Sequence, residues 1–189
     1  MQPDLRPYTN ALWIAAGFLW LASSISTKRN LRIQTGSSRA FQVLLAASGF
    51  LLYFAPWSYG PLGSKVLPDS APIAYTGLVL TAAGIGFAVW ARLTLGRNWS
   101  GVVSTKKDHA LIRKGPYAVV RHPIYSGGLF ALFGTALCVG ELRGFIGCAF
   151  VFAGWWMKSR LEERFMLEQF GSEYAHYQHD VKGLIPFVL

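Results

Sequence analysis

Residues 121–140 read RHPIYSGGLFALFGTALCVG, and this stretch decides the class of fold that we expect. Pro123 suits the first turn of a helix, where an N–H group would have no intrahelical acceptor and the fixed φ of proline is already helical. His122 precedes the proline and is therefore biased towards an extended conformation, so a helix should begin here. From Tyr125 to Gly140 the residues are almost wholly apolar. The stretch predicts a membrane helix with Arg121 and His122 at its interfacial end, where polar residues are typically functional.

The composition of the 189-residue chain agrees with a membrane protein. Hydrophobic residues make up 52% of the sequence and charged residues 14%, whereas soluble domains contain about 25% charged residues. The net charge of +9 alone would also suit a nucleic-acid partner, but the charges are confined to short connections between long apolar blocks. We therefore expect an all-α integral membrane protein that forms one domain over residues 1–189 and binds no nucleic acid.

Five apolar blocks are candidates for membrane helices, since a span needs about 20 apolar residues. Their predicted limits are residues 11–26, 40–59, 71–91, 124–140 and 144–158. Only residues 141–143 separate the last two blocks, which should form a tight helical hairpin over residues 124–158. The fifth block is short, so three possibilities are open: it tilts little, it pairs closely with the fourth, or it continues as one helix into the tail. We accordingly expect three N-terminal spans within residues 1–91 and a cofactor-binding region within residues 92–189.

The distribution of basic residues predicts the orientation, because cytoplasmic connections are enriched in Lys and Arg. The first connection contains Lys28, Arg29, Arg32 and Arg39 with no acidic residue, and residues 92–121 contain seven basic residues and one Asp. Both connections are therefore expected in the cytoplasm, which places the N-terminus outside and the C-terminal region inside. In a bacterium the membrane would be the inner one. No cleavable signal peptide is expected, because no small-x-small site followed by a soluble domain is present.

Two observations argue against other kinds of site. Cys138 and Cys148 lie in predicted membrane helices and form no CxxC pair, so we expect two small core residues with no disulfide and no metal site. The chain also contains no strand–GxGxxG–helix unit, since Gly84-Ile85-Gly86 lies inside a predicted membrane helix. A Rossmann domain is therefore not expected.

Charged residues recur at helical spacing just beyond the fifth block. Lys158 and Glu162 are four residues apart and share one helix face, while Arg160 and Glu163 lie on an adjoining face. Taken alone, this spacing is also typical of an interfacial helix with ion pairs and basic side chains that extend to the membrane surface. Together with the segment around His122, it would form a polar cluster next to an apolar bundle.

Several motifs occur in order along the C-terminal half of the chain. They are LGRNWS (95–100), DHALI (108–112), GPYxxxRHPxYxG (115–127), EExxxxxxFGxxYxxY (162–177) and IPF (185–187). Through these motifs the chain resembles the isoprenylcysteine carboxyl methyltransferase family, part of a wider group of membrane methyltransferases that includes the phospholipid N-methyltransferases. The resemblance covers roughly residues 90–189. It implies a helical membrane protein that binds S-adenosylmethionine without a Rossmann domain.

The resemblance also implies which residues bind the cofactor. The matching positions are His109, Ala110, Leu111, Ile112, Tyr117, His122, Pro123, Ile124, Tyr125 and Glu162, and we expect Arg121 and Glu163 beside them. A helix N-terminus at Pro123 would favour the carboxylate of the cofactor. Glu162 and tyrosine faces would suit its amino and sulfonium groups. The segment 109–112 could line the adenine with backbone and aliphatic groups.

A basic residue beside the methyl acceptor is also implied, at the position of Lys158. Characterised eukaryotic members of the family have arginine there, and lysine lacks the bidentate fork of arginine, so Arg160 is an alternative substrate-orienting residue. Methyl transfer to a carboxylate needs no general base, only alignment and exclusion of water. We expect a lipophilic or prenylated acceptor drawn from the membrane lipid, with a prenylcysteine-type carboxylate as the first choice.

Three alternative functions are compatible with parts of this pattern. The first is N-methylation of a phospholipid or another amine. The second is an NADPH-dependent membrane reductase with an RHP-like motif, although this class would require further cationic residues and more spans. The third is a non-catalytic membrane scaffold that retains the fold.

Overall fold

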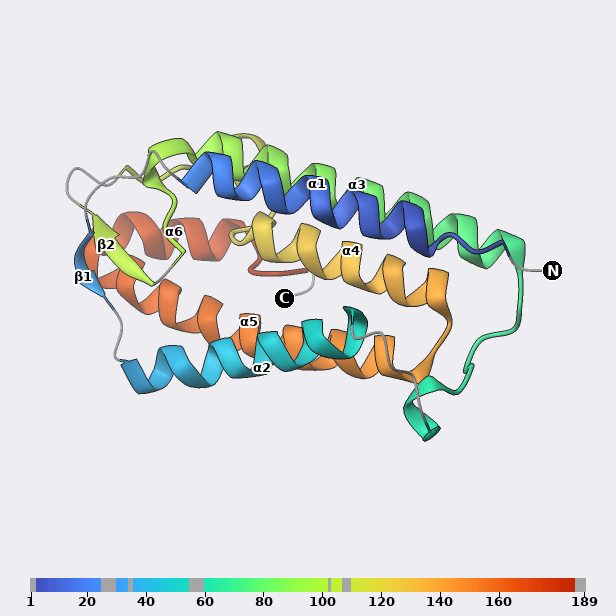
Figure 1. The fold of residues 1–189 in the computed structure, drawn as a ribbon. Helices are drawn as coiled ribbons and strands as arrows, with labels where there is room; N and C mark the ends of the chain where they lie inside the picture. The colour runs from blue at the N-terminus through green and yellow to red at the C-terminus, as the bar shows by residue number, and fades with distance from the viewer. Residues whose placement is uncertain are drawn as a thin grey trace.

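A computed structural model describes residues 3–24, 30–33, 36–54, 60–101, 103–106 and 110–185 of the chain. Most of these residues form helices, which run roughly side by side (Figure 1). The helices are α1 (Arg6–Ser24), α2 (Gly36–Phe54), α3 (Ala71–Leu95), α4 (Pro123–Val139), α5 (Leu142–Phe170) and α6 (Ser172–Asp180). Short 3-10 helices are η1 (Gly60–Gly63), η2 (Gly96–Asn98) and η3 (Gly115–Ala118), and the strands are β1 (Asn30–Ile33) and β2 (Ser104–Lys106).

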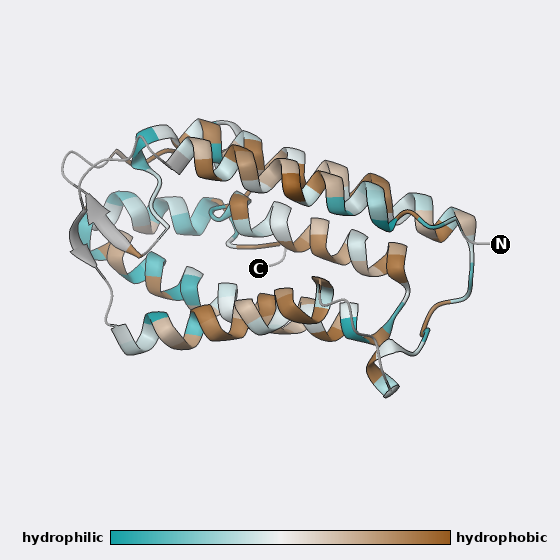
Figure 2. Cartoon of the chain, in the orientation of Figure 1, coloured by the Kyte–Doolittle hydropathy of each residue, from teal (hydrophilic) through white to brown (hydrophobic). Residues whose placement is uncertain are grey.

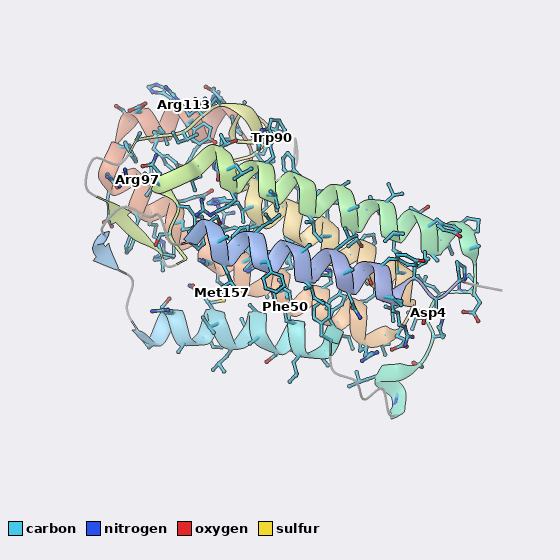
Figure 3. All side chains as sticks on the ribbon, turned by 45° about the horizontal axis from the view of Figure 1, so that its top comes forward. Asp4, Phe50, Trp90, Arg97, Arg113 and Met157 are labelled. Carbon is cyan, nitrogen blue, oxygen red and sulfur yellow. The ribbon has the colours of Figure 1, made fainter. Side chains whose placement is uncertain are left out.

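The long helices pack in an order that differs from their order in the sequence. α3 lies between α1 and α4, and α5 lies between α4 and α2, so the spatial order is α1–α3–α4–α5–α2 (Figure 1). The consecutive helices α1 and α2 therefore pack on different partners. Aromatic side chains connect them, because the ring of Trp13 meets the ring of Phe50 edge-on at 6.0 Å. Figure 3 shows Phe50 projecting from α2 towards α1.

A small antiparallel sheet departs from the all-α expectation. β1 pairs with β2, with Asn30 opposite Lys106 and Ile33 opposite Ser104. Both strands belong to polar connections at the same end of the bundle, where each supplies hydrogen-bonding partners for the backbone of the other. Figure 2 shows hydrophilic residues gathered at this end, on α6 and the C-terminal part of α5, and hydrophobic residues along the middle of the bundle.

The fifth predicted block is the first part of a longer helix. α5 continues without a break to Phe170, so the alternative in which this block extends into the tail is the correct one. Residues 159–170 are rich in Glu, Leu, Arg, Met and Gln, which are strong helix formers. The helix ends at Gly171, whose φ of 54° is unfavourable for residues with a side chain. The second predicted block corresponds to α2 as far as Phe54, and its last five residues, 55–59, lie outside the described part of the chain.

Glycines hold α3 and α4 at a short distance from each other. A Cβ atom added at Gly84 would lie 2.5 Å from the carbonyl oxygen of Gly127 and 2.5 Å from the amide of Ala131. The relation is reciprocal, since a Cβ at Gly127 would lie 2.6 Å from the carbonyl oxygen of Gly84. Small residues of this kind allow close packing between helices in membranes. The close contact fixes where α4 begins relative to α3, and thereby positions the site described below.

The end of the bundle opposite α6 is closed by a buried acidic residue. Glu141, between α4 and α5, accepts hydrogen bonds from Arg6 (2.6 Å) and Arg143 (2.6 Å). Glu141 and Arg143 are both buried. The N-terminus of α1 is therefore attached to the turn of the α4–α5 hairpin through a shared carboxylate.

The outward faces of the helices carry large apolar side chains. Phe18, Leu44 and Val79 are among the exposed hydrophobic residues of α1, α2 and α3. One described helical stretch, Ala71–Asn98, is long and apolar enough to cross a membrane by length and composition, and the apolar α4 is shorter. Extensive exposed apolar surface of this kind is typical of contact with lipid or with another protein.

Candidate active site

A cavity of about 550 Å³ lies where α4 begins, with walls from all six α-helices and from η2 and η3. Its two parts differ in chemistry. One part is lined by charged and polar groups of α4 and α5. The other follows the apolar faces of the long helices, with Trp13, Ala16, Gly17, Trp20, Phe50 and Ile85 in its wall. The volume falls within the range of small-molecule and cofactor sites.

The first turn of α4 forms one wall of the cavity, and the C-terminal segment supports it. The amides of Arg121 and His122 donate to the carbonyl oxygens of Lys182 (2.8 Å) and Gly183 (3.0 Å). These contacts hold the dipeptide before Pro123 in place, with His122 at φ −120° and ψ 59° and not in the extended conformation expected from the sequence. In the helix that follows, the first amide groups have no intrahelical acceptor, and Pro123 and Ile124 line the cavity. The sequence therefore places the positive end of a helix dipole at the cavity wall.

Glu162 presents a carboxylate to the cavity from α5. The hydroxyl of Tyr125 donates to its Oε1 at 2.6 Å, and Nδ1 of His122 lies 3.4 Å from its Oε2. Burial opposes the negative charge, but the hydrogen bond with His122, the charge of Lys158 and the bond from Tyr125 lower the pKa of Glu162. The side chain is therefore ionised at neutral pH.

Glu163 lies behind the cavity wall and not in it. Its Oε1 accepts from Nε (3.0 Å) and Nη2 (2.6 Å) of Arg121, and Nε2 of His122 lies 3.3 Å away. Burial alone would raise the pKa of Glu163, but the bonds with His122 and Arg121 lower it to about 2. The guanidinium of Arg121 also donates to the carbonyl oxygens of Gln178 and Val181. Arg121 and Glu163 thus connect α4, α5 and the C-terminal segment.

His122 lies between the two carboxylates and uses both ring nitrogens. Burial works against a charged imidazole, but the hydrogen bonds and negative charges of Glu162 and Glu163 raise the pKa of His122 above its usual value. The ring also stacks on Tyr125, with centroids 5.6 Å apart and an interplanar angle of 14°. This arrangement holds the ring in one orientation next to the cavity.

Lys158 is one helical turn before Glu162 and lines the same cavity. Its Nζ donates to the carbonyl oxygen of Gly101 at 3.0 Å and lies 5.5 Å from the centre of the Tyr125 ring. Arg160 points elsewhere. Its guanidinium lies over the ring of Trp156 at 4.2 Å and 3.5 Å from Glu163, and Arg160 is not in the cavity wall.

Of the remaining residues predicted to bind the cofactor, four line the cavity and one lies outside the described part of the chain. Ala110, Leu111, Ile112 and Tyr117 are all in its wall. The hydroxyl of Tyr177 donates to the carbonyl oxygen of Tyr117 at 2.6 Å, which fixes this segment on α6. Burial, followed by the charge of Glu162, raises the pKa of Tyr117, so its hydroxyl stays neutral. His109 lies outside the described residues.

Trp155 is a wall residue that the motifs alone did not identify. Its ring lies 5.4 Å from that of Tyr125, and it occupies the space beside Gly128, where an added Cβ would lie 2.6 Å from the indole. Trp155, Lys158 and Glu162 follow one another at spacings of three and four residues, which defines one helix face. Extending that face towards the membrane would have identified the tryptophan. Within the described ranges, no group of three His, Cys, Asp or Glu side chains is placed to hold a metal ion.

Comparison with known proteins identifies the family. The sequence profile of the phospholipid methyltransferase family matches residues 73–173, more than half of the chain. The chain therefore belongs to this family of methyltransferases. The match begins in α3, some way before the motifs that carry the resemblance.

Several similar proteins of known name are isoprenylcysteine methyltransferases, as the motifs predicted. A protein-S-isoprenylcysteine O-methyltransferase of Saccharomyces cerevisiae is 35% identical over 117 residues, or 59% of this chain and 48% of the relative. One of Tribolium castaneum is 34% identical over 59% of this chain and 41% of the relative. The matches thus span about half the length of these relatives or less.

A solved structure has a similar fold. It is that of a eukaryotic intramembrane Ras methyltransferase, isoprenylcysteine carboxyl methyltransferase, with a TM-score of 0.56 and 27% sequence identity. The likeness covers 82% of this chain and 55% of the other. It extends beyond the roughly 100 C-terminal residues in which the motifs lie.

Proposed function

We propose that this protein is an S-adenosylmethionine-dependent methyltransferase that methylates the carboxylate of a prenylcysteine-type acceptor at the membrane interface. The observation that carries the proposal is the pairing, in one cavity, of the ionised Glu162 with the cation of Lys158. An acidic group suits the cationic donor and a basic group suits an acidic acceptor. The apolar part of the cavity, between α1 and α2, suits the hydrocarbon chain of the acceptor.

The residues in the cavity wall fit the cofactor. Glu162 would accept hydrogen bonds from its amino group, and the amides of the first turn of α4 would receive its carboxylate. The ring faces of Tyr117 and Tyr125 suit a sulfonium. Residues 110–112 offer aliphatic side chains and backbone groups to the adenine. We keep His109, Arg121 and Glu163 as parts of this predicted site, the last two as residues that position His122.

Bound S-adenosylmethionine supplies a methyl group activated by its sulfonium. The task of the chain is then to align the acceptor with that methyl group and to exclude water. Lys158 would orient the acceptor carboxylate by a charge-assisted hydrogen bond. Trp155 and Tyr125 would cover the reacting groups with apolar surface. No side chain has to remove a proton, because the acceptor carboxylate is already ionised.

Phospholipid N-methylation is a second candidate, which the family profile favours. An amine acceptor would have to lose a proton and approach the ammonium group of Lys158, a like charge that disfavours it. The same cation attracts a carboxylate. We therefore rank the carboxylate acceptor first and Lys158 ahead of Arg160 as the residue that orients it.

We also propose that α1 to α5 cross the membrane, with residues 1–91 forming three spans and residues 92–189 forming the cofactor-binding region of a single domain. The N-terminus would lie outside, and the cavity would open to the cytoplasm. Single cysteines at Ser64 and Glu173 test this orientation in intact cells. A membrane-impermeant thiol reagent should label the first position and spare the second, and the reverse pattern would contradict the proposal.

Methyl transfer with purified protein in detergent tests the activity. Labelled S-adenosylmethionine is supplied with an N-acetylated S-farnesylcysteine, with its methyl ester, or with phosphatidylethanolamine. We expect label in the first acceptor and none in the ester, whose carboxylate is blocked. Label confined to phosphatidylethanolamine would establish the second candidate. Binding of the cofactor without any transfer would point to a non-catalytic role.

Lys158→Ala tests the division of roles within the cavity. The KM for the acceptor should rise at least tenfold, while the Kd for the cofactor changes little. Lys158→Arg should restore most of the loss, since it keeps the positive charge. Equal losses in the binding of cofactor and acceptor would show that Lys158 does not act on the acceptor alone.

A further inference from the structure

A second, smaller cavity of about 130 Å³ adjoins the main one between α2 and α5. Arg39, Gln42, Val43 and Ala46 line it from one face of α2, and Gly154, Trp155 and Lys158 line it from α5, with Gly101 at one side. We call this space the α2–α5 crevice. Trp155, Lys158 and Gly101 also line the main cavity, so these three residues form the partition between the two.

A hydrogen bond joins two residues of the partition, Lys158 and Gly101. Nζ of Lys158 donates to the carbonyl oxygen of Gly101 at 3.0 Å, which uses one of the three donors of the ammonium group. Among the described residues, no other acceptor takes a hydrogen bond from Nζ, so its other two donors can reach a ligand in either space. A carboxylate that approached from the crevice would therefore meet Lys158 before it entered the main cavity.

Arg39 supplies a second cation at the crevice. It lies in the first turn of α2, and its side chain is exposed while it lines the space that Lys158 also lines. A guanidinium offers a planar pair of donors that matches a carboxylate, whereas an ammonium is a single charged point. Two cations from different helices around one crevice repel each other, so an anion between them lowers the electrostatic energy of the site.

The rest of the crevice suits the part of an acceptor next to the carboxylate. Val43 and Ala46 line the crevice with apolar side chains. Gly154 has no side chain to fill the space between α5 and α2, where an added Cβ would lie 3.2 Å from the carbonyl oxygen of Gln42. The crevice thus combines a cationic mouth with an apolar floor. It has no counterpart among the motifs, since Arg39 lies more than fifty residues before the first of them.

We infer that Arg39 is a specificity-determining residue that, with Lys158, binds the carboxylate of the acceptor in the α2–α5 crevice and delivers it to the main cavity. The inference rests on the proposed function for the identity of the acceptor. It adds a binding residue on α2. Arg39 would supply the bidentate guanidinium that a lysine at position 158 cannot offer.

The experiment measures equilibrium binding of N-acetyl-S-farnesylcysteine and of its carboxamide to the purified protein in detergent, and then the kinetics of methyl transfer. Wild-type protein should bind the carboxylate at least tenfold more tightly than the amide. Arg39→Ala should reduce this preference to threefold or less and raise the KM for the acceptor about tenfold, with kcat and the Kd of the cofactor nearly unchanged. Arg39→Lys should recover part of the preference. Arg164→Ala, an exposed arginine of α5 outside both cavities, is the control and should behave as wild type.

The outcomes separate this inference from the proposed function. If wild-type protein fails to transfer methyl groups, the proposed function is wrong. The role of the crevice is still decided by binding alone, from whether Arg39→Ala loses the preference for the carboxylate over the carboxamide. If transfer occurs and Arg39→Ala keeps the full preference, the inference is overturned while the proposed function stands. An equal loss of affinity for carboxylate and amide would also overturn it, because Arg39 would then act on the packing of α2.

Discussion

At the scale of single residues, the site depends on a buried chain of charges. His122 bridges Glu162, which faces the cavity, and Glu163, which faces the C-terminal segment through Arg121. The two glutamates are adjacent in the sequence but have different roles, because neighbouring residues on a helix point about 100° apart. One is available to a ligand, and the other positions the histidine.

Glu162→Ala should weaken binding of S-adenosylmethionine by about 1.5–3 kcal/mol, the range for a hydrogen bond to a charged group. Titration calorimetry with S-adenosylhomocysteine, which keeps the amino group, measures the effect as roughly a tenfold to 150-fold rise in Kd. Glu168→Gln, a change at an exposed carboxylate of the same helix, is the control. An unchanged Kd in Glu162→Ala would remove this residue from the cofactor site.

Glu163 should make stability depend on pH in the acidic range. Its pKa falls from an ordinary value of 4.5 to about 2 in the folded protein. The stability that it contributes is therefore complete above about pH 4.5 and is lost as the pH falls towards 2, and its size is on the order of 3 kcal/mol. Melting temperatures in detergent should fall over this range. Glu163→Gln should be less stable at pH 6 and show a flatter profile, and a profile parallel to that of wild type would contradict the assignment.

At the scale of elements, the position of the site depends on how closely α3 and α4 approach. α4 begins at Pro123, directly after His122. The glycine contacts between α3 and α4 fix the position of α4 along its axis and its rotation about that axis. A side chain at this contact would push α4 away and open the cavity wall. The effect should reach the cofactor site even though these glycines bind nothing.

Gly84→Ala should destabilise the protein by about 1–3 kcal/mol, the usual cost of overpacking, because its Cβ would lie 2.5 Å from backbone atoms of α4. Gly86→Ala is a matched control on the same helix, since an added Cβ there has no neighbour within 4 Å. The control should be neutral or slightly stabilising, because alanine favours a helix more than glycine does. Thermal unfolding in detergent compares the two, and equal melting temperatures would refute the close-packing argument.

At the scale of the whole molecule, the two ends of the bundle have separate tasks. The cavity lies at the start of α4, and Glu141 lies beyond its far end, about 25 Å away at 1.5 Å per residue. Glu141 joins the N-terminus of α1 to the α4–α5 hairpin through Arg6 and Arg143. This arrangement holds α1 against the bundle, so that its aromatic side chains can line the apolar part of the cavity.

Glu141→Ala should reduce stability by about 3–5 kcal/mol, because it removes a buried carboxylate that pairs with both Arg6 and the buried Arg143. Asp69→Ala removes an exposed partner of Lys65 near the same end and should change stability far less, because solvent screens an exposed ion pair. Unfolding in detergent measures both. At temperatures where Glu141→Ala is folded, its Kd for the cofactor should equal that of wild type, and a selective loss of binding would contradict a purely structural role.

Much of the site could be predicted from the sequence, because its motifs are local. Pro123 favours the first turn of a helix through its own fixed φ, and Lys158 and Glu162 share a face of any helix that contains them. The motifs from residue 95 onwards were sufficient to indicate the methyltransferase family. The predicted helical blocks also correspond to α1 to α5, with shifts at their ends.

The sequence by itself determined a bundle of apolar helices with a polar, motif-rich end, since hydrophobic period and helix-start signals are properties of neighbouring residues. Only the tertiary structure decided that Glu162 faces the cavity while Glu163 turns to Arg121, that α2 brings Arg39 beside Lys158, and that β1 pairs with β2. These contacts join residues far apart in the chain. They depend on which helices pack together and at what rotation, and that is set by the close fit of side chains along whole helices.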